Sequence, residues 1–269
     1  MHKKCILGVS GQTNSGKDTI ADYLVADRGF VRVALADPIK RFCHQVFGFS
    51  KEQLWGPSRH RNAVDHRFDK PEAWELAELQ LNLHGTQFCR HLLAKEDVAE
   101  AVKALSHWFF WMQAQASLGK LEISPRVVLQ LLGTEWGREA ISENIWIDDL
   151  LRTAKTLLRE DGSTRCVRYD PLFGVIGTHG SPTILGVVVS DVRFQNEFAA
   201  IRKEGGSIIR VVRPETDDEA AGIGIAGHAS EATSFDFAEF DFMVRNDSSV
   251  AALLKNVDIF INVFFMTHH

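Results

Sequence analysis

Residues Gly11 to Thr19 have the types and the spacing that suit phosphate chemistry. They read GQTNSGKDT, which matches the glycine-rich loop that binds nucleoside triphosphates. Gly11 and Gly16 let backbone amides approach phosphate oxygens without a Cβ in the way, and Lys17 can neutralise the β- and γ-phosphates. An apolar run precedes the loop and a helical pattern follows it. The sequence therefore predicts a site for ATP or a similar triphosphate.

The residue after the lysine departs from the usual pattern of such loops. Asn14 and Ser15 add further backbone amides, but the Ser or Thr normally found after the lysine is replaced by Asp18, with Thr19 next. A carboxylate beside a triphosphate is repulsive unless a metal ion or an arginine lies between them. Either Asp18 or Thr19 could bind Mg²⁺, directly or through water.

A second carboxylate, Asp191, ends the apolar run at 185–190. Parallel sheets of this kind often keep a carboxylate at such a strand end, near the Mg²⁺ of a bound triphosphate. We therefore predict that Asp191 is a metal-site residue. The alternative is that it only caps the helix that follows.

Arginines outside regular helix faces form another group with potential chemistry. Transfer of a phosphoryl group between two anionic nucleotides needs cations that neutralise both. Any single exposed arginine can instead be a solvated surface charge. The candidates are Arg59, Arg61, Arg67, Arg126, Arg138, Arg193 and Arg213.

Composition excludes several classes of function. The chain has 269 residues, 45% apolar and 24% charged, as in ordinary globular enzymes. Its formal charge of −5 provides no broad basic surface, so we expect no stable nucleic-acid binding. No apolar run is long enough to span a membrane. The 4 cysteines lack zinc-ligand spacing and indicate reduced thiols in a cytoplasmic protein.

The elements that must position these residues alternate between strand and helix. Patterns predict strands at 5–10, 30–36, 185–190, 207–212 and 241–244. They predict helices at 17–26, 37–47, 125–132, 145–159, 195–203 and 248–264, the second with Asp37 as its N-cap. Alternation of this kind predicts an α/β fold with a parallel sheet between helices.

We expect residues 1–269 to form a single domain with a helical insertion or cap at 56–120. Within it, 56–72 reads as an Arg-rich loop and 72–119 as mostly helical. The aromatic residues at 108–111 favour a core position over a base-stacking surface, although they could also serve a dimer interface. Residues 160–183 read as a flexible loop, a lid or a small hairpin.

Taken together, these segments resemble a known family. The motifs GQTNSGKDT, ALADPIK at 34–40, LQLLGTEWGR at 129–138, SDVRFQNEFAAIR at 190–202, IIRVVRP at 208–214, HASE at 228–231 and RND at 245–247 occur in this order. They are similar to those of the deoxynucleoside monophosphate kinases of tailed bacteriophages, over residues 6–257. The pair LQ-x-x-GTE-x-x-R and DVRF-x-NE is the most specific part. The fold implied is a three-layer P-loop sandwich of the nucleoside-monophosphate-kinase type.

The resemblance implies ATP-dependent phosphorylation of a deoxynucleoside 5′-monophosphate, with Mg²⁺. Lys17 and the loop amides would hold the ATP phosphates, and Thr19 would help to hold the ion. Arg193 would approach the transferred group, and Arg213 would lie near the donor. The acceptor would be bound by Asp37, Lys40, Gln130, Thr134, Glu135 and Arg138, to which we add Arg59 of the Arg-rich segment. His228 and Glu231 match the family without a physical role that we can derive.

Two other functions stay open at this point. Another kinase of this fold, acting on dephospho-coenzyme A or phosphomevalonate, would use the same loop and arginines. An ATP-driven, DNA-associated motor would use the loop alone, and the acidic net charge argues against it. The expected partners are therefore small molecules, the deoxynucleoside monophosphate and ATP, and we leave room for a homodimer.

Overall fold

The computed structural model describes residues 5–12, 14–158, 165–179, 184–214 and 240–267. Two compact units can be recognised among them. One contains the residues up to Leu35 and from Leu150 onward, and the other is Ala36–Asp149. The helices expected within 56–120 all lie in the second unit. Assignment of the whole chain to one kinase domain stays a prediction.

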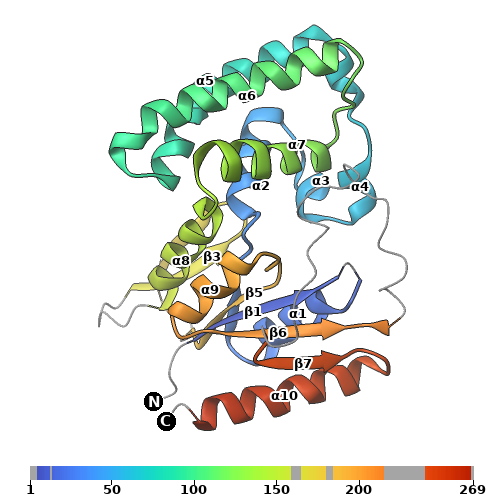
Figure 1. Cartoon of the computed structure of the whole chain (residues 1–269), viewed down its shortest axis with the longest axis vertical. Coiled ribbons are helices and arrows are strands. Elements are labelled where there is room, and N and C mark those ends of the chain that lie inside the picture. The colour runs from blue at the N-terminus through green and yellow to red at the C-terminus, as the bar shows by residue number, and fades with distance from the viewer. Residues whose placement is uncertain (1–4, 13, 159–164, 180–183, 215–239, 268–269) are drawn as a thin grey trace. The chain divides into compact units, whose positions relative to one another are not determined.

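The first unit is built on a five-stranded sheet in the order β2-β5-β1-β6-β7 (Figure 1). Every neighbouring pair in this sheet is parallel. The strands are β1 (Cys5–Gly11), β2 (Phe30–Arg32), β5 (Gly186–Val189), β6 (Ser207–Val212) and β7 (Phe242–Arg245). The predicted parallel α/β sheet is therefore confirmed.

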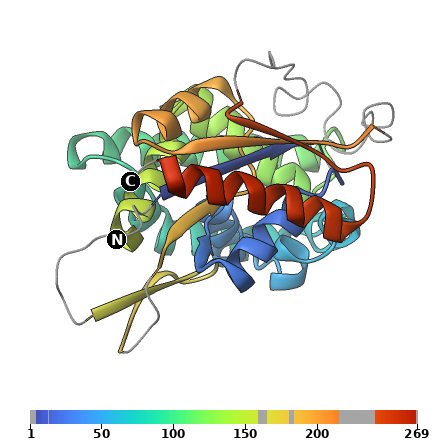
Figure 2. The ribbon, with the colours of Figure 1, turned by 90° about the horizontal axis from the view of Figure 1, so that it is seen from below.

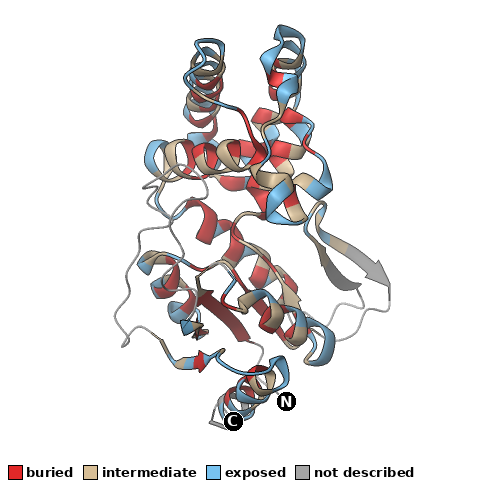
Figure 3. Cartoon of the chain, turned by 90° about the vertical axis from the view of Figure 1, so that its right-hand side faces the viewer, coloured by how far each residue is buried: buried red, intermediate tan, exposed pale blue. Residues whose placement is uncertain are grey.

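Helices cover both faces of the sheet. Alternate residues of β1, such as Leu7 and Val9, join a buried cluster with α1 (Lys17–Asp27) and α10 (Val250–Thr267). These two helices contact each other, and Figure 2 shows them on one side of the strands. On the other face, α9 (Gln195–Lys203) packs on β1 and β6. Three layers result, and the strands between them are largely buried (Figure 3).

Two further elements belong to this part of the chain. Helix α8 (Ile145–Leu158) begins in the second unit and ends in the first. Strands β3 (Arg165–Asp170) and β4 (Gly174–His179) form an antiparallel hairpin, so the hairpin alternative for part of 160–183 is present. No helix among the described stretches is both long and apolar enough to cross a bilayer.

The second unit is helical. Its long helices α5 (Pro71–Leu92) and α6 (Val98–Ser117) pack on each other, and α2 (Asp37–Phe47) packs on α5. Its remaining elements are α3 (Lys51–Trp55), α4 (Ser58–Asn62), α7 (Pro125–Leu131), the 3₁₀ turns η1 (His66–Asp69) and η2 (Lys95–Asp97), and the π-helix η3 (Leu132–Ile141). The core prediction for 108–111 is correct for Trp108 and Phe109, but Phe110 and Trp111 are 45% and 48% exposed.

Three local predictions were wrong. Residues 56–72 contain α4 and η1 instead of a loop. The N-cap of the turn η1 is Asp65, whose side chain accepts a bond from the amide of Arg67. Asp37 is not an N-cap, since the N-cap is Ala36 and makes no side-chain bond. Strand β2 stops at Arg32, well short of residue 36, because the amide of Leu35 donates to the Asp191 carboxylate at 3.0 Å.

Candidate functional site

The loop between β1 and α1 has the backbone of a phosphate cradle. Gly16 has φ +102°, in the left-handed region that favours glycine, and Asn14 has φ +63°. A Cβ on Gly16 would lie 2.6 Å from Nδ2 of Asn246, and one on Gly11 would lie 2.9 Å from the carbonyl oxygen of Val211. Both glycines are therefore required by close packing as well as by the approach of a ligand.

Lys17 lies over this loop. Its Nζ donates to the carbonyl oxygen of Gln12 at 3.0 Å. Burial is the main cause that lowers the pKa of Lys17. The nearby carboxylates of Asp18 and Asp191 raise this pKa, and the guanidinium groups of Arg193 and Arg32 lower it. The charges of two other predicted site residues, Asp191 and Arg193, thus act on the Lys17 ammonium.

Ser15 connects the loop to a distant part of the chain. Its carbonyl oxygen accepts a bond from Nδ2 of Asn246 at 2.8 Å. Its hydroxyl is buried and has no hydrogen-bond partner within the described residues. A buried hydroxyl of this kind is costly unless a ligand or water satisfies it. Sequence reasoning noted Asn246 only as part of the RND motif and assigned it no role.

Asp18 is paired with an arginine that the sequence did not point to. Nη2 of Arg32 forms an ion pair with Oδ1 of Asp18, and Nη1 lies 3.1 Å from Oδ1 of Asp22. Nε of Arg32 donates to the Ser190 hydroxyl at 2.9 Å, which holds the guanidinium in place. The Asp18 side chain is 64% exposed. Arg32 lies outside every motif, so no local signal could have identified it.

Asp191 and Arg193 are positioned by different groups. Asp191 accepts from the Leu35 amide, as described above. The amides of Arg193 and Phe194 donate to Oε2 of Glu197 at 2.6 and 3.0 Å, and Glu197 is buried. Helix α9 is therefore capped by Glu197, and the alternative of Asp191 as its cap is wrong.

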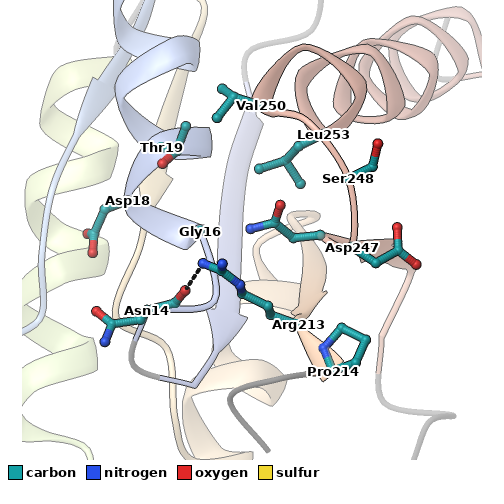
Figure 4. A pocket seen from close by; sticks show the side chains of 11 residues that line it. Asn14, Gly16, Asp18, Thr19, Arg213, Pro214, Asp247, Ser248, Val250 and Leu253 are labelled. Atoms are coloured by element: carbon teal, nitrogen blue, oxygen red, sulfur yellow. Dashed lines mark hydrogen bonds between the residues drawn. The ribbon is translucent and has the colours of Figure 1, made fainter.

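A cavity of about 790 Å³ opens beside the loop (Figure 4). The guanidinium of Arg213 points toward Asn14 and donates to its carbonyl oxygen at 3.5 Å, while the Asp18 carboxylate points away from Arg213. The walls combine charged or polar groups with apolar ones: Asn14, Gly16, Asp18, Thr19, Arg213, Pro214, Asn246, Asp247, Ser248, Val250 and Leu253. This mixture suits a nucleoside attached to phosphates.

The candidates for acceptor binding lie in the helical unit. Asp37, at the start of α2, is buried and accepts from Nε1 of Trp55 at 3.2 Å. Nζ of Lys40 lies 5.6 Å from the centre of the Trp55 ring, a cation–π distance. Trp55, at the end of α3, is a further aromatic with a polar tip at this place. Sequence reasoning missed it, because a single tryptophan outside every motif gives no pattern.

The GTEWGR segment forms the π-helix η3, where the sequence predicted only a helix ending at 132. Two glycines make this possible. A Cβ on Gly137 would collide with the Trp146 ring, and Nε1 of Trp146 donates to the carbonyl oxygen of Gly133 at 2.8 Å. The wider turn carries Thr134, Glu135 and Arg138. Long π-helices are rare and often occur at functional sites.

The π-helix carries charged side chains of both signs, the carboxylates of Glu135 and Glu139 and the guanidinium of Arg138. Burial raises the pKa of Glu135, and the nearby Glu139 raises it further. Nη1 of Arg138 donates to the carbonyl oxygen of Glu143 at 3.3 Å. Helix α7, which carries Gln130, contacts α2, α4 and η3, so the elements of the other acceptor candidates, Asp37, Lys40 and Arg59, all pack against it. Nε of Arg59 donates to the His60 ring.

The predicted residues divide cleanly between the two units. Every donor-side and metal candidate lies in the unit with the sheet, and every acceptor candidate lies in Ala36–Asp149. His228 and Glu231 are outside the described residues. The division agrees with two nucleotides that are held by separate sets of side chains.

Comparison with known proteins gives two kinds of similarity. A family described as deoxynucleotide monophosphate kinase matches residues 5–167. A protein of Acanthamoeba polyphaga mimivirus that carries the name of deoxynucleotide monophosphate kinase is 25% identical over 257 residues, 94% of this chain and 93% of the relative. The deoxynucleoside-5′-monophosphate kinase of Escherichia phage T5 is 24% identical over 212 residues, 74% of this chain and 72% of that protein.

Proposed function

Because the chain belongs to the deoxynucleotide monophosphate kinase family, we propose that it transfers the γ-phosphoryl group of ATP to the 5′-phosphate of a deoxynucleoside monophosphate. The kinase activity and the small-molecule substrates follow from the family. ATP as the donor and Mg²⁺ as its ion are part of the proposal. The phosphate loop carries it: the Lys17 ammonium lies over the loop, and the Ser15 hydroxyl is buried without a partner in the described part of the chain.

Donor binding is assigned to the unit with the sheet. The amides of the Gly11–Thr19 loop would donate to the β- and γ-phosphate oxygens, with Lys17 neutralising them. The adjoining cavity, with Val250 and Leu253 on one wall and Arg213 on another, has the mixed lining that a nucleoside needs. Asn246 would act indirectly, because it fixes the loop through Ser15.

Thr19 fits the role of Mg²⁺ ligand better than Asp18 does. The Asp18 carboxylate is already paired with Arg32, whereas Thr19 lines the cavity beside the loop. No group of three His, Cys, Asp or Glu side chains in the described residues could hold a metal by itself. Mg²⁺ usually takes few protein ligands and completes its shell with phosphate oxygens and water, so this set is sufficient. The ion would neutralise charge on the phosphates, and Asp191 would support it from the end of β5.

Acceptor binding is assigned to the helical unit. The cations there, Arg138, Lys40 and Arg59, would neutralise the acceptor phosphate. The neighbouring polar groups would bind the base or sugar, and they are Asp37, Gln130, Thr134 and Glu135. A π-helix places Thr134, Glu135 and Arg138 on one widened turn.

The chemistry needs no covalent intermediate and no strong general base. An acceptor phosphate is already anionic near neutral pH, so it can attack the γ-phosphorus directly. The protein contributes by alignment and by charge neutralisation. Arg193 is suited to stabilise the transferred group, because it is exposed, it lies near Lys17, and its backbone is fixed by Glu197.

A coupled assay of ADP release tests the proposal. The purified chain with ATP and Mg²⁺ is offered dAMP, dGMP, dCMP and dTMP, and their ribose counterparts as controls. We expect turnover that requires a deoxynucleoside monophosphate and yields the diphosphate. Turnover with dephospho-coenzyme A or phosphomevalonate alone, or ATP hydrolysis stimulated by DNA, would contradict it. The family match does not favour either of those functions.

The relatives support a proposal for the cellular setting of the reaction. Both come from viruses, one a bacteriophage. We therefore propose that the enzyme works in the cytoplasm of an infected host and supplies deoxynucleotides for DNA synthesis.

A further inference from the structure

Helix α5 carries leucines on two opposite faces. One face packs into the core of the helical unit and includes Trp74 and Leu81. Leu76, Leu79 and Leu83 are instead 59%, 55% and 62% exposed. With about 3.6 residues per turn, spacings of three and four place these leucines in one stripe opposite the core face. Figure 3 shows helices of this unit that are buried on one side and exposed on the other.

The stripe ends in charges of opposite sign. Glu72 lies one turn before Leu76, and Arg90 lies two turns after Leu83. The two charges are about five full turns apart, so they share the side of the helix on which the leucines lie. Both are exposed, and neither has a hydrogen bond or ion pair with another described residue. Each charge is thus available to a partner.

The pattern is complementary to itself when the helix is turned end for end. Glu72 and Arg90 are equidistant from position 81, and so are Leu79 and Leu83. Two copies of α5 packed antiparallel about a twofold axis would therefore place Glu72 of each opposite Arg90 of the other. The leucine pairs would meet between them. Such self-complementarity is what an isologous dimer interface requires.

We propose that the exposed face of α5 is the contact surface of a homodimer. Charge complementarity within one helix favours a second copy over an unrelated partner, because this chain supplies both members of each ion pair. A single helix pair makes a small interface, so the dimer should be weak, with a dissociation constant of about 1–100 µM. The proposal goes beyond the kinase function, since α5 carries none of the residues assigned to either nucleotide.

Sedimentation velocity on the full chain, over roughly 1–200 µM, is the first test. We expect the dimer fraction to rise with concentration. Leu79→Lys and Leu83→Lys should each raise the dissociation constant by at least about tenfold, because they bury a charge between apolar groups. The matched control is Leu118→Lys, which changes a leucine on the α6 cap that is 65% exposed and should leave the dimer unchanged.

Charge reversal tests the register. In the Glu72→Arg variant and in the Arg90→Glu variant, residues of like charge would face each other at both ends of the helix pair. Each variant should therefore raise the dissociation constant of the dimer by about tenfold. The double variant should restore it. An equimolar mixture of the two single variants should also associate more tightly than either one alone, because one chain is then basic at both ends and the other acidic.

Several results would overturn the proposal. They are a wild-type chain that stays monomeric throughout the range, a dimer unaffected by Leu79→Lys, and a mixture of single variants that associates no better than its components. Circular dichroism melts of each variant show that the fold is kept. Kinase turnover per subunit should change less than about twofold in all of them, since these are exposed positions and none of them is assigned to either nucleotide.

Discussion

The phosphate loop and the π-helix η3 both depend on glycine, but for different reasons. In the loop, Gly16 has a φ of +102° that other residues rarely adopt, and its missing Cβ leaves backbone amides accessible. In η3, neither Gly133 nor Gly137 has a positive φ. Gly137 is required because the Trp146 ring fills the space of its Cβ. Close packing thus constrains both glycines, and only Gly16 also has a backbone conformation that favours glycine.

The two regions also differ in what holds them. The loop is tied to Asn246, which is 231 positions away in the sequence. The π-helix is tied to Trp146, which donates to Gly133 only 13 positions earlier. Perturbing the loop should therefore alter nucleotide affinity with little effect on folding. Perturbing η3 should first alter local stability and, through it, the placement of Arg138.

Removing the central cation of each region gives the largest expected effects. Lys17→Ala should lower kcat roughly a thousandfold, because the ammonium neutralises charge that moves during transfer. Arg138→Ala should lower kcat/KM roughly a hundredfold, mainly through the KM of the acceptor. Steady-state kinetics with each substrate varied in turn, together with binding of a non-hydrolysable ATP analogue, would measure both.

Binding of the ATP analogue distinguishes the effects of these two variants. Arg138→Ala should still bind the ATP analogue, whereas Lys17→Ala should not. Lys103→Ala, which removes a lysine that is 64% exposed on α6, serves as a control with normal kinetics. Near-normal turnover of Lys17→Ala or Arg138→Ala would refute the assignment of that residue.

Gly137→Ala tests the packing role of glycine in η3. The new Cβ would collide with the Trp146 ring, so we expect about 2 kcal/mol or more of destabilisation and loss of acceptor binding. Gly133→Ala is the matched control, because its Cβ would meet only the flexible end of Ile39 at 3.3 Å and should cost less than about 1 kcal/mol. Urea unfolding of both variants measures the difference. Equal losses would mean that Trp146 does not select glycine here.

The sequence predicted the loop region better than the η3 region. The loop is a local unit of strand, glycines and helix, and β1, α1, β6 and α9 were placed within a few residues or at their observed bounds. The π-helix was missed, because periodicity cannot show that a distant tryptophan will widen a turn. The Arg-rich 56–72 segment was misjudged for a similar reason, since Asp65 and Arg67 start a turn that composition alone does not indicate.

Residues that act by tertiary contact were the least predictable part of the site. Lys17, Asp191 and Arg193 were predicted from motifs, and the charges of Asp191 and Arg193 act on the Lys17 ammonium. Arg32 and Asn246 were not assigned roles, because their partners Asp18 and Ser15 are remote in sequence or separated by a helix. Motifs identified the candidate ligand-binding groups, whereas the groups that hold those motifs in place are set by the fold.

Asn246→Ala tests the anchor of the loop. Loss of the bond from Nδ2 to the Ser15 carbonyl oxygen should raise the KM for ATP by about tenfold, with a smaller change in kcat. Ser249→Ala is a control in the same connection, because Ser249 accepts from the amide of Ala252 and caps α10 without touching the loop. It should lower stability by about 1 kcal/mol and leave the KM for ATP unchanged. Equal KM values in the two variants would exclude an anchoring role.

The pH dependence of ATP binding should report on Lys17. Burial lowers its pKa, so the free enzyme loses the proton at a lower pH than an ordinary lysine does. Only the charged form attracts phosphate. The affinity for ATP should therefore fall as pH rises through this lowered pKa, by at most about tenfold per pH unit. The Lys17→Arg variant keeps its positive charge over this pH range, so its affinity for ATP, although weaker, should not change with pH. If its affinity fell with pH as that of the wild type does, the titrating group would be another one.

The smallest expected effect concerns Asp18, which lies in the usual hydroxyl position of the loop. Arg32→Ala should raise the KM for ATP only about threefold, because the exposed Asp18 carboxylate is screened by solvent even without its partner. Adding Asp18→Asn to Arg32→Ala should reverse the change, since the repulsive charge is then gone. If Asp18→Asn alone instead raised the Mg²⁺ requirement more than about tenfold, Asp18 would be the metal ligand. We expect the higher Mg²⁺ requirement in Thr19→Ala instead. If Asp18 were the ligand, Thr19→Ala would behave like the wild type, and the loop would bind its ion through a carboxylate.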